Sequence, residues 1–292
     1  MKNVKAKTNE QIAMQVSANS IAVNLMLSIF KLIAGLLASS GAMISDAIHS
    51  ASDVFSTIIV IIGVKISGKA SDEDHPYGHD RFECVASIIL AILLGVTGVG
   101  IGLTGVQKLM AGHYDTLAVP GMLALAAAVI SIVVKEIMYW YTRNAAKKIN
   151  SGALMADAWH HRSDALSSVG SFVGIFGARM GFPMLDPLAS VVICLFVVKA
   201  AVDIFRDAIS KMTDKSCDQK TVNEMHDCIM NIQGVERIDL LKTRSFGSKY
   251  YVDIEISADG NKKLWETHAI AENVHQAIEH QFPLVKHCMV HV

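Results

Sequence analysis

Six long runs of mainly apolar residues limit what this chain can fold into. They lie at about residues 11–38, 41–66, 84–110, 119–141, 153–180 and 184–209. Each run is long enough for a helix to cross the hydrocarbon core of a bilayer, which takes about 20 residues. Hydrophobic residues make up 52% of the chain. Because helices satisfy their own backbone hydrogen bonds in lipid, the runs predict an α-helical membrane protein with six transmembrane helices.

The composition changes after Ser210, where charged residues become frequent again. We expect a six-helix transmembrane domain at residues 1–210 and a second domain at residues 211–292. Helical and alternating hydrophobic patterns predict the order αββαβ in this second part. The helices are expected at residues 220–232 and 264–281, and the strands at residues 235–244, 250–257 and 287–292. This order predicts a three-stranded sheet with helices on one face.

The charges of the loops indicate the orientation of the chain. Lys108 and Arg179 are the only basic loop residues on one side of the predicted spans, and the others lie on the opposite side. Since basic loops stay in the cytoplasm, both termini are expected there. The formal net charge of -1 argues against a nucleic-acid partner. The five cysteines form no CxxC pair, so we expect reduced thiols.

One motif occurs twice inside the predicted spans. Residues 46–53 and 157–164 both read Asp-Ala-x-His-x-x-Ser-Asp. On a helix, the His and the last Asp lie one turn apart on one face. Two such helices facing each other offer four ligands that suit a divalent transition metal, zinc especially: His49, Asp53, His160 and Asp164. The alternative is that these groups only join helices by polar contacts. Asp46 and Asp157 are expected to support the ligands or to line a path to them.

Other residues of the spans have simpler interpretations. Five further charges are expected to reach the membrane surface or to pair between helices: Lys31, Lys135, Glu136, Lys199 and Asp203. A set of glycines in the third run predicts close helix packing: Gly95, Gly98, Gly100, Gly102 and Gly105.

Two further clusters have the composition of metal sites. The loop at residues 72–83 holds Asp72, His75 and His79, which are two imidazoles four apart with carboxylates on either side. Its alternative is a solvated acidic loop that precedes the third span. The C-terminal part holds several acids and histidines: Asp239, Asp253, Glu255, His268, His275, His280, His287 and His291. Their alternative is a scatter of solvated surface residues.

The chain resembles the cation diffusion facilitator family of metal/proton antiporters. Four stretches carry the resemblance: residues 45–53, 75–83, 156–164 and 234–244. The resemblance implies a transport site of His49, Asp53, His160 and Asp164. It also implies a loop site of Asp72, His75 and His79. The C-terminal domain is expected to be ferredoxin-like and metallochaperone-like, to bind metal and to dimerise. Its metal ligands would be Asp239, Glu255, His268 and His291, with Glu255 at a position that is often His in the family.

The resemblance thus implies a secondary active transporter in the cell (inner) membrane. It would export a divalent metal from the cytoplasm, zinc by preference, with iron, manganese, cobalt and cadmium as alternatives. Protons would be the counter-substrate, metal would also act as a regulatory ligand, and no prosthetic group is expected. A homodimer is implied, with Arg81 and Asp214 as a pair at the membrane surface. The alternative is a membrane metal sensor that binds zinc without transporting it. No enzyme is expected, because the chain has no His-Glu-x-x-His stretch and no nucleophile motif.

Overall fold

The computed structural model describes residues 8–37, 41–111, 122–179 and 184–292. For some helical residues, Asp46 and His49 among them, it describes the backbone alone. The chain divides into two compact units, Met1–Ala208 and Ile209–Val292. Each unit is built around its own core.

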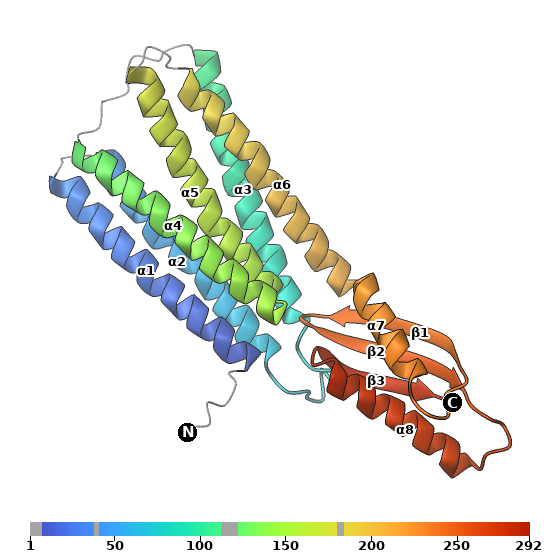
Figure 1. The fold of residues 1–292 in the computed structure, drawn as a ribbon. Coiled ribbons are helices and arrows are strands. Elements are labelled where there is room, and N and C mark those ends of the chain that lie inside the picture. Colours follow the sequence, from blue (N-terminus) through green and yellow to red (C-terminus); the bar gives the residue numbers. More distant parts are fainter. Residues whose placement is uncertain (1–7, 38–40, 112–121, 180–183) are drawn as a thin grey trace. The chain divides into compact units, whose positions relative to one another are not determined.

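The described residues of the first unit form six long helices, which lie side by side in Figure 1. They are α1 (Asn9–Leu37), α2 (Gly41–Ser67), α3 (Phe82–Ala111), α4 (Met122–Ile149), α5 (Gly152–Arg179) and α6 (Leu185–Met212). Among the described residues, three segments are long and apolar enough by themselves to cross a membrane: Asn9–Ala34, Phe82–Met110 and Pro187–Met212. Ionisable residues in α4 and α5 make these two helices more polar. Large apolar side chains such as Met26 and Phe196 are exposed on the helices, as expected for a lipid-facing surface.

The fourth helix is longer than its apolar run. It continues past the predicted end at Tyr141 to Ile149. The segment from Thr142 to Lys148 contains no Gly or Pro, and its Ala and Lys residues favour helix. The helix ends where Asn150 adopts a positive φ of 55°, a common way to close a helix at its C-terminus.

Small residues let the helices approach closely. A Cβ added to Gly98 would lie 2.8 Å from Cγ1 of Val197, and one added to Gly102 would lie 2.4 Å from Sγ of Cys194. One turn further on, a Cβ on Gly105 would lie 2.9 Å from the carbonyl oxygen of Pro187. These three glycines, which we call the glycine row, place the backbone of α3 against α6. The close packing predicted for the third run is thus present at the glycine row.

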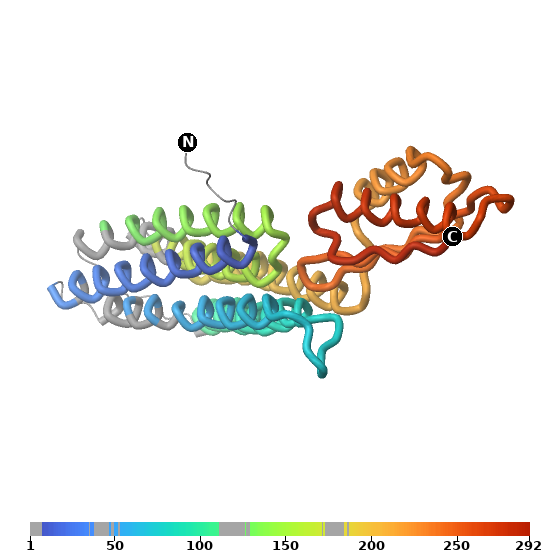
Figure 2. Tube along the Cα trace, turned by 90° about the horizontal axis from the view of Figure 1, so that it is seen from below, coloured from blue at the N-terminus to red at the C-terminus, as the bar shows by residue number. Residues whose placement is uncertain are grey.

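The second unit has the predicted order of helices and strands. It contains α7 (Gln219–Met230), β1 (Arg237–Phe246), β2 (Lys249–Ser257), α8 (Leu264–Gln281) and β3 (Val285–His291). Strand β2 lies in the centre of the sheet, antiparallel to β1 and parallel to β3. Both helices cover the same face of the sheet (Figure 2). The fold class expected from the sequence is therefore confirmed.

The core of the second unit follows from strand alternation. Val252, Ile254 and Ile256 of β2 are buried, and they pack with Val274 and Ile278 of α8. Side chains at the intervening positions of a strand point to the opposite face. Asp253 and Glu255 therefore lie on the face of the sheet that the helices leave open.

Candidate metal centre

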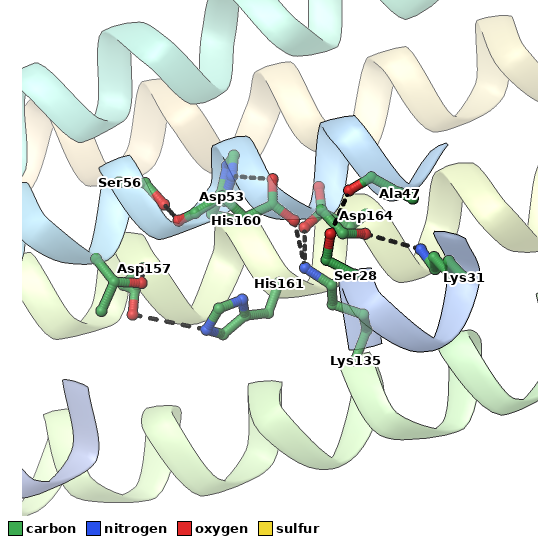
Figure 3. Close-up of polar contacts among 12 residues, drawn as sticks. Ser28, Lys31, Ala47, Asp53, Ser56, Lys135, Asp157, His160, His161 and Asp164 are labelled. Atoms are coloured by element: carbon green, nitrogen blue, oxygen red, sulfur yellow. Dashed lines mark hydrogen bonds and ion pairs between the residues drawn. The ribbon is translucent and has the colours of Figure 1, made fainter. Parts of the chain in front are cut away.

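Three of the four residues predicted for the transport site come together in the first unit. Asp53 of α2 and His160 and Asp164 of α5 each offer a ligand atom, and these atoms all lie within 4.8 Å of one another. Oδ1 of Asp53 lies 3.3 Å from Nε2 of His160 (Figure 3). Both carboxylates are buried, with exposed fractions of 2% for Asp53 and 8% for Asp164. Nitrogen and oxygen ligands of this kind suit a divalent transition metal.

Helix geometry explains this arrangement. His160 and Asp164 are four residues apart on α5, so they lie on one face of the helix. Helix α2 packs against α5 and brings Asp53 to that face. The side chain of His49, the fourth predicted ligand, lies outside the described residues, so its role stays a prediction. Asp46, which shares the same repeat, has no described side chain either.

A lysine from a third helix contacts both carboxylates. Nζ of Lys135 in α4 lies 2.5 Å from Oδ2 of Asp53 and 2.9 Å from Oδ2 of Asp164. Its side chain is only 2% exposed. Of the two interpretations of this residue from sequence, pairing between helices is the one that the structure shows. The sequence did not indicate which acids it meets, although a lysine inside a span needs a buried partner.

A second polar cluster lies one turn away from the candidate ligands. Asp157 and His161 of α5 are both fully buried, and Nε2 of His161 lies 3.6 Å from Oδ2 of Asp157. The hydroxyl of Thr57 in α2 donates to Oδ1 of Asp157 over 3.1 Å. Asp157 thus links α2 to α5 beside the site, which fits its predicted supporting role. His161 was missed, because a single histidine next to the motif gives no signal of its own.

Polar side chains continue along the interior of the bundle. Nζ of Lys31 in α1 donates to Oγ of Ser50 in α2 over 2.8 Å. Other buried polar side chains have no hydrogen-bond partner among the described residues: Ser17, Ser20, Asn24, Ser131, Thr142 and Ser163. Buried polar groups without partners cost free energy in an apolar environment, whereas groups along a hydrated path do not carry this cost.

The predicted loop residues also come together. Ligand atoms of Asp72, His75 and His79 all lie within 4.8 Å of one another. Nε2 of His79 lies 3.4 Å from Oδ2 of Asp72, and Nδ1 of His75 lies 3.4 Å from Oδ1. Nδ1 of His79 donates to the carbonyl oxygen of Ala70 over 3.1 Å. This leaves Nε2 of His79 as the nitrogen that can bind a metal.

The loop carboxylate is held in its ionised form. The backbone N–H of His75 donates to Oδ1 of Asp72 over 2.7 Å. This hydrogen bond lowers the pKa of Asp72 below its ordinary value. A carboxylate that stays ionised in mild acid is suited to bind a cation.

The four residues predicted for the C-terminal site are not close enough to form such a group in the part of the chain that the structure describes. Glu255 and His291 are partners in the parallel register of β2 and β3. Oδ1 of Asp239 forms an ion pair with the guanidinium of Arg237, whose Nη2 is 2.6 Å away, and the hydroxyl of Ser257 donates a hydrogen bond to Oδ2. His268 is exposed on α8, the helix that covers the other face of the sheet. The C-terminal set therefore stays a prediction.

The predicted pair of Arg81 and Asp214 falls on two different units. Asp214 adopts a positive φ of 60° just after α6. Their pairing across a membrane surface also stays a prediction.

Comparisons with known proteins decide the family. Residues 17–213 match the cation efflux transmembrane domain, and residues 217–292 match the cytoplasmic domain of cation efflux proteins. The chain belongs to the cation diffusion facilitator, or cation efflux, family. Membership makes it an integral membrane protein of a family of divalent metal efflux transporters, which is consistent with a non-enzyme.

Relatives resemble the chain along nearly its whole length. An uncharacterized transporter of Methanocaldococcus jannaschii is 37% identical and covers 94% of this chain and 95% of its own. Manganese efflux system protein MneP of Bacillus subtilis is 33% identical over 98% of both chains. Magnetosome protein MamB of Magnetospira sp. is 30% identical over 88% of this chain and 87% of its own.

Proposed function

We propose that this chain exports a divalent transition metal from the cytoplasm in exchange for protons. Asp53, His160 and Asp164 bind the metal, together with His49. The observation that carries this proposal is the convergence of one imidazole and two buried carboxylates from α2 and α5. Ionisable residues are rare inside membrane proteins and mark ion pathways there.

Zinc is the first candidate for the transported ion. Imidazole suits zinc, whereas carboxylates also accept manganese and iron. The manganese efflux protein among the relatives makes manganese the second ion to test. Cobalt and cadmium complete the series, because ligand type ranks these metals without excluding any.

Coupling to protons follows from the chemistry of the imidazole ligand. Histidine binds a metal as the neutral base, so protons compete with the metal for the same nitrogen. A conformational change would expose the site first to the cytoplasm and then to the opposite side of the membrane. The site would then release the metal and bind protons in its place. Buried polar side chains of α1, α4 and α5 have no hydrogen-bond partner among the described residues, and this supports a hydrated path between these helices.

The remaining expectations complete the proposal. The protein lies in the cell membrane with both termini in the cytoplasm and works as a homodimer. The match to a cytoplasmic domain supports this orientation and leaves the C-terminal unit free to bind cytosolic metal. The loop ligands Asp72, His75 and His79 would bind a regulatory metal on the same side.

Uptake into proteoliposomes loaded with a zinc-sensitive dye tests the proposal. We expect zinc uptake that depends on a pH gradient and is lost in Asp164→Asn. Asp203→Asn, which changes an exposed carboxylate of α6, is the matched control and should transport normally. Zinc binding without uptake in the unaltered chain would favour the sensor alternative. Normal uptake by Asp164→Asn would refute the assignment of the site.

A further inference from the structure

The ammonium group of Lys135 contacts both carboxylates of the proposed metal site. It lies 2.5 Å from Oδ2 of Asp53 and 2.9 Å from Oδ2 of Asp164, and it comes from α4, a helix with no candidate metal ligand of this site among its described residues. The lysine is buried and bridges two acids that belong to different helices. Lys135 therefore lies among the candidate ligands themselves. A basic residue that only balanced the charge of the protein surface would not lie there.

A metal and this ammonium group would compete for the same two carboxylates. A bound zinc would lie about 2.0–2.2 Å from a carboxylate oxygen. An ammonium group held by the same oxygens would then lie within about 5 Å of a divalent ion, where two positive charges repel strongly in a low-dielectric interior. Metal binding at these oxygens therefore favours movement of Nζ of Lys135 away from Asp53 and Asp164.

We propose that Lys135 is a tethered competitor of the transported metal, which must leave Asp53 and Asp164 when the metal binds and returns to them when the metal leaves. This rests on the proposed function, in which both carboxylates are metal ligands. The lysine weakens metal binding and assists release, because the outgoing ion leaves no uncompensated buried charge behind. Removal of one partner from a buried pair otherwise leaves such a charge, which is strongly unfavourable.

The same face of α4 offers the displaced group another contact. Ser131 lies one turn before Lys135, and its buried hydroxyl has no hydrogen-bond partner among the described residues. A lysine side chain has four rotatable carbon–carbon bonds and can reorient its ammonium group without moving the helix. The competitor can thus leave the carboxylates and stay inside the protein.

Neutral substitutions of the lysine test the proposal in the full-length protein. Zinc transport is measured in proteoliposomes over a range of zinc concentrations for Lys135→Met and Lys135→Gln. We expect the half-saturating zinc concentration to fall by about tenfold or more, which corresponds to about 1.4 kcal/mol or more. The maximal rate should fall as well, because the metal leaves more slowly. Lys135→Arg keeps the positive charge, so its half-saturating zinc concentration and its maximal rate should stay closer to those of the unaltered protein.

Controls separate this proposal from the proposed function. Lys199→Met removes an exposed lysine of α6 and should change neither quantity. The glutamine variant retains hydrogen-bond donors for the carboxylates, so it serves if the methionine variant does not fold, which size-exclusion chromatography shows. Unchanged or weaker zinc saturation in folded neutral variants, with transport still lost in Asp164→Asn, would overturn the role of Lys135 alone. Normal transport by Asp164→Asn would overturn the proposed function instead.

Discussion

Oδ1 of Asp53 lies 3.3 Å from Nε2 of His160, although 107 residues separate the two in the chain. The contact joins α2 to α5, the two helices that carry the repeated motif. It brings an acid of the first copy to an imidazole of the second. The two copies thus contribute to one site instead of forming two separate ones.

The contact between Thr57 and Asp157 predicts a large effect on stability. Thr57→Val keeps the shape of the side chain but removes the hydroxyl that donates to a fully buried carboxylate. We expect a loss of about 1–3 kcal/mol, since the carboxylate loses its donor. Thr97→Val is the matched control, because that hydroxyl donates to a backbone carbonyl at an exposed position of α3. Thermal unfolding of the purified variants measures both, and equal melting temperatures would contradict the prediction.

The glycine row predicts a contrast between two positions on one helix. Gly102→Ala places a Cβ 2.4 Å from Sγ of Cys194, whereas Gly100→Ala meets nothing within 4 Å. We expect the first change to destabilise the protein by about 1–3 kcal/mol through overpacking. The second should be neutral or stabilising by up to about 1 kcal/mol, because Ala favours helix over Gly. Melting temperatures of the two variants check the order, which a reversed ranking would disprove.

The loop cluster predicts a metal site that is separable from transport. His79→Ala removes the buried imidazole whose Nε2 faces Asp72. We expect one fewer bound zinc per chain in equilibrium dialysis. Zinc transport by this variant should persist and should still be lost when Asp164→Asn is added. His226→Ala serves as the control, since His226 is an exposed residue of α7 next to Asp227. An unchanged number of bound zinc ions in His79→Ala would count against a loop site.

The start of α7 predicts a pH-dependent contribution to stability. Asp218 accepts hydrogen bonds from the backbone N–H and the hydroxyl of Thr221. These bonds hold the pKa of Asp218 below its ordinary value. A lowered pKa gives stability that is present above the unfolded-state pKa of about 4 and is lost as the pH falls through the folded-state pKa.

Asp218→Ala should therefore lower the stability of the C-terminal unit by about 1 kcal/mol near neutral pH. The difference should be smaller near pH 3, because the carboxyl of the unfolded state, with a pKa of about 4, is then mostly protonated. Unfolding by urea at the two pH values, followed by circular dichroism, measures the effect. A difference that grows in acid would contradict the assignment of Asp218 as the capping residue.

Local signals explain how much of the fold could be predicted. The bounds of α8 match the expected range, because Asp259-Gly260-Asn261 interrupts the chain before it and Pro283 follows it. The strand pattern of β2 was equally clear from its alternation. The end of α4 was predicted too early, since the apolar run stops before the helix does.

The candidate site could be predicted only where a local pattern places the residues. His160 and Asp164 lie on one helix, so their spacing fixes their common face. The repeat then indicated Asp53 as their partner. Lys135 could not be assigned, because its position depends on which face of α4 packs toward α2 and α5. His268 illustrates the same limit, as the sequence predicts its helix but not whether its side chain reaches Glu255 and His291 on the strands.

The glycine row has a mechanical consequence. Because the backbone of α3 lies close to α6 at three successive turns, sliding or tilting one helix without the other would create clashes. The two helices are therefore expected to move together as one rigid body during a transport cycle. Openings that lead to the buried carboxylates are then expected along the contacts of the other helices, where hydroxyl and charged groups can exchange partners, and not between α3 and α6.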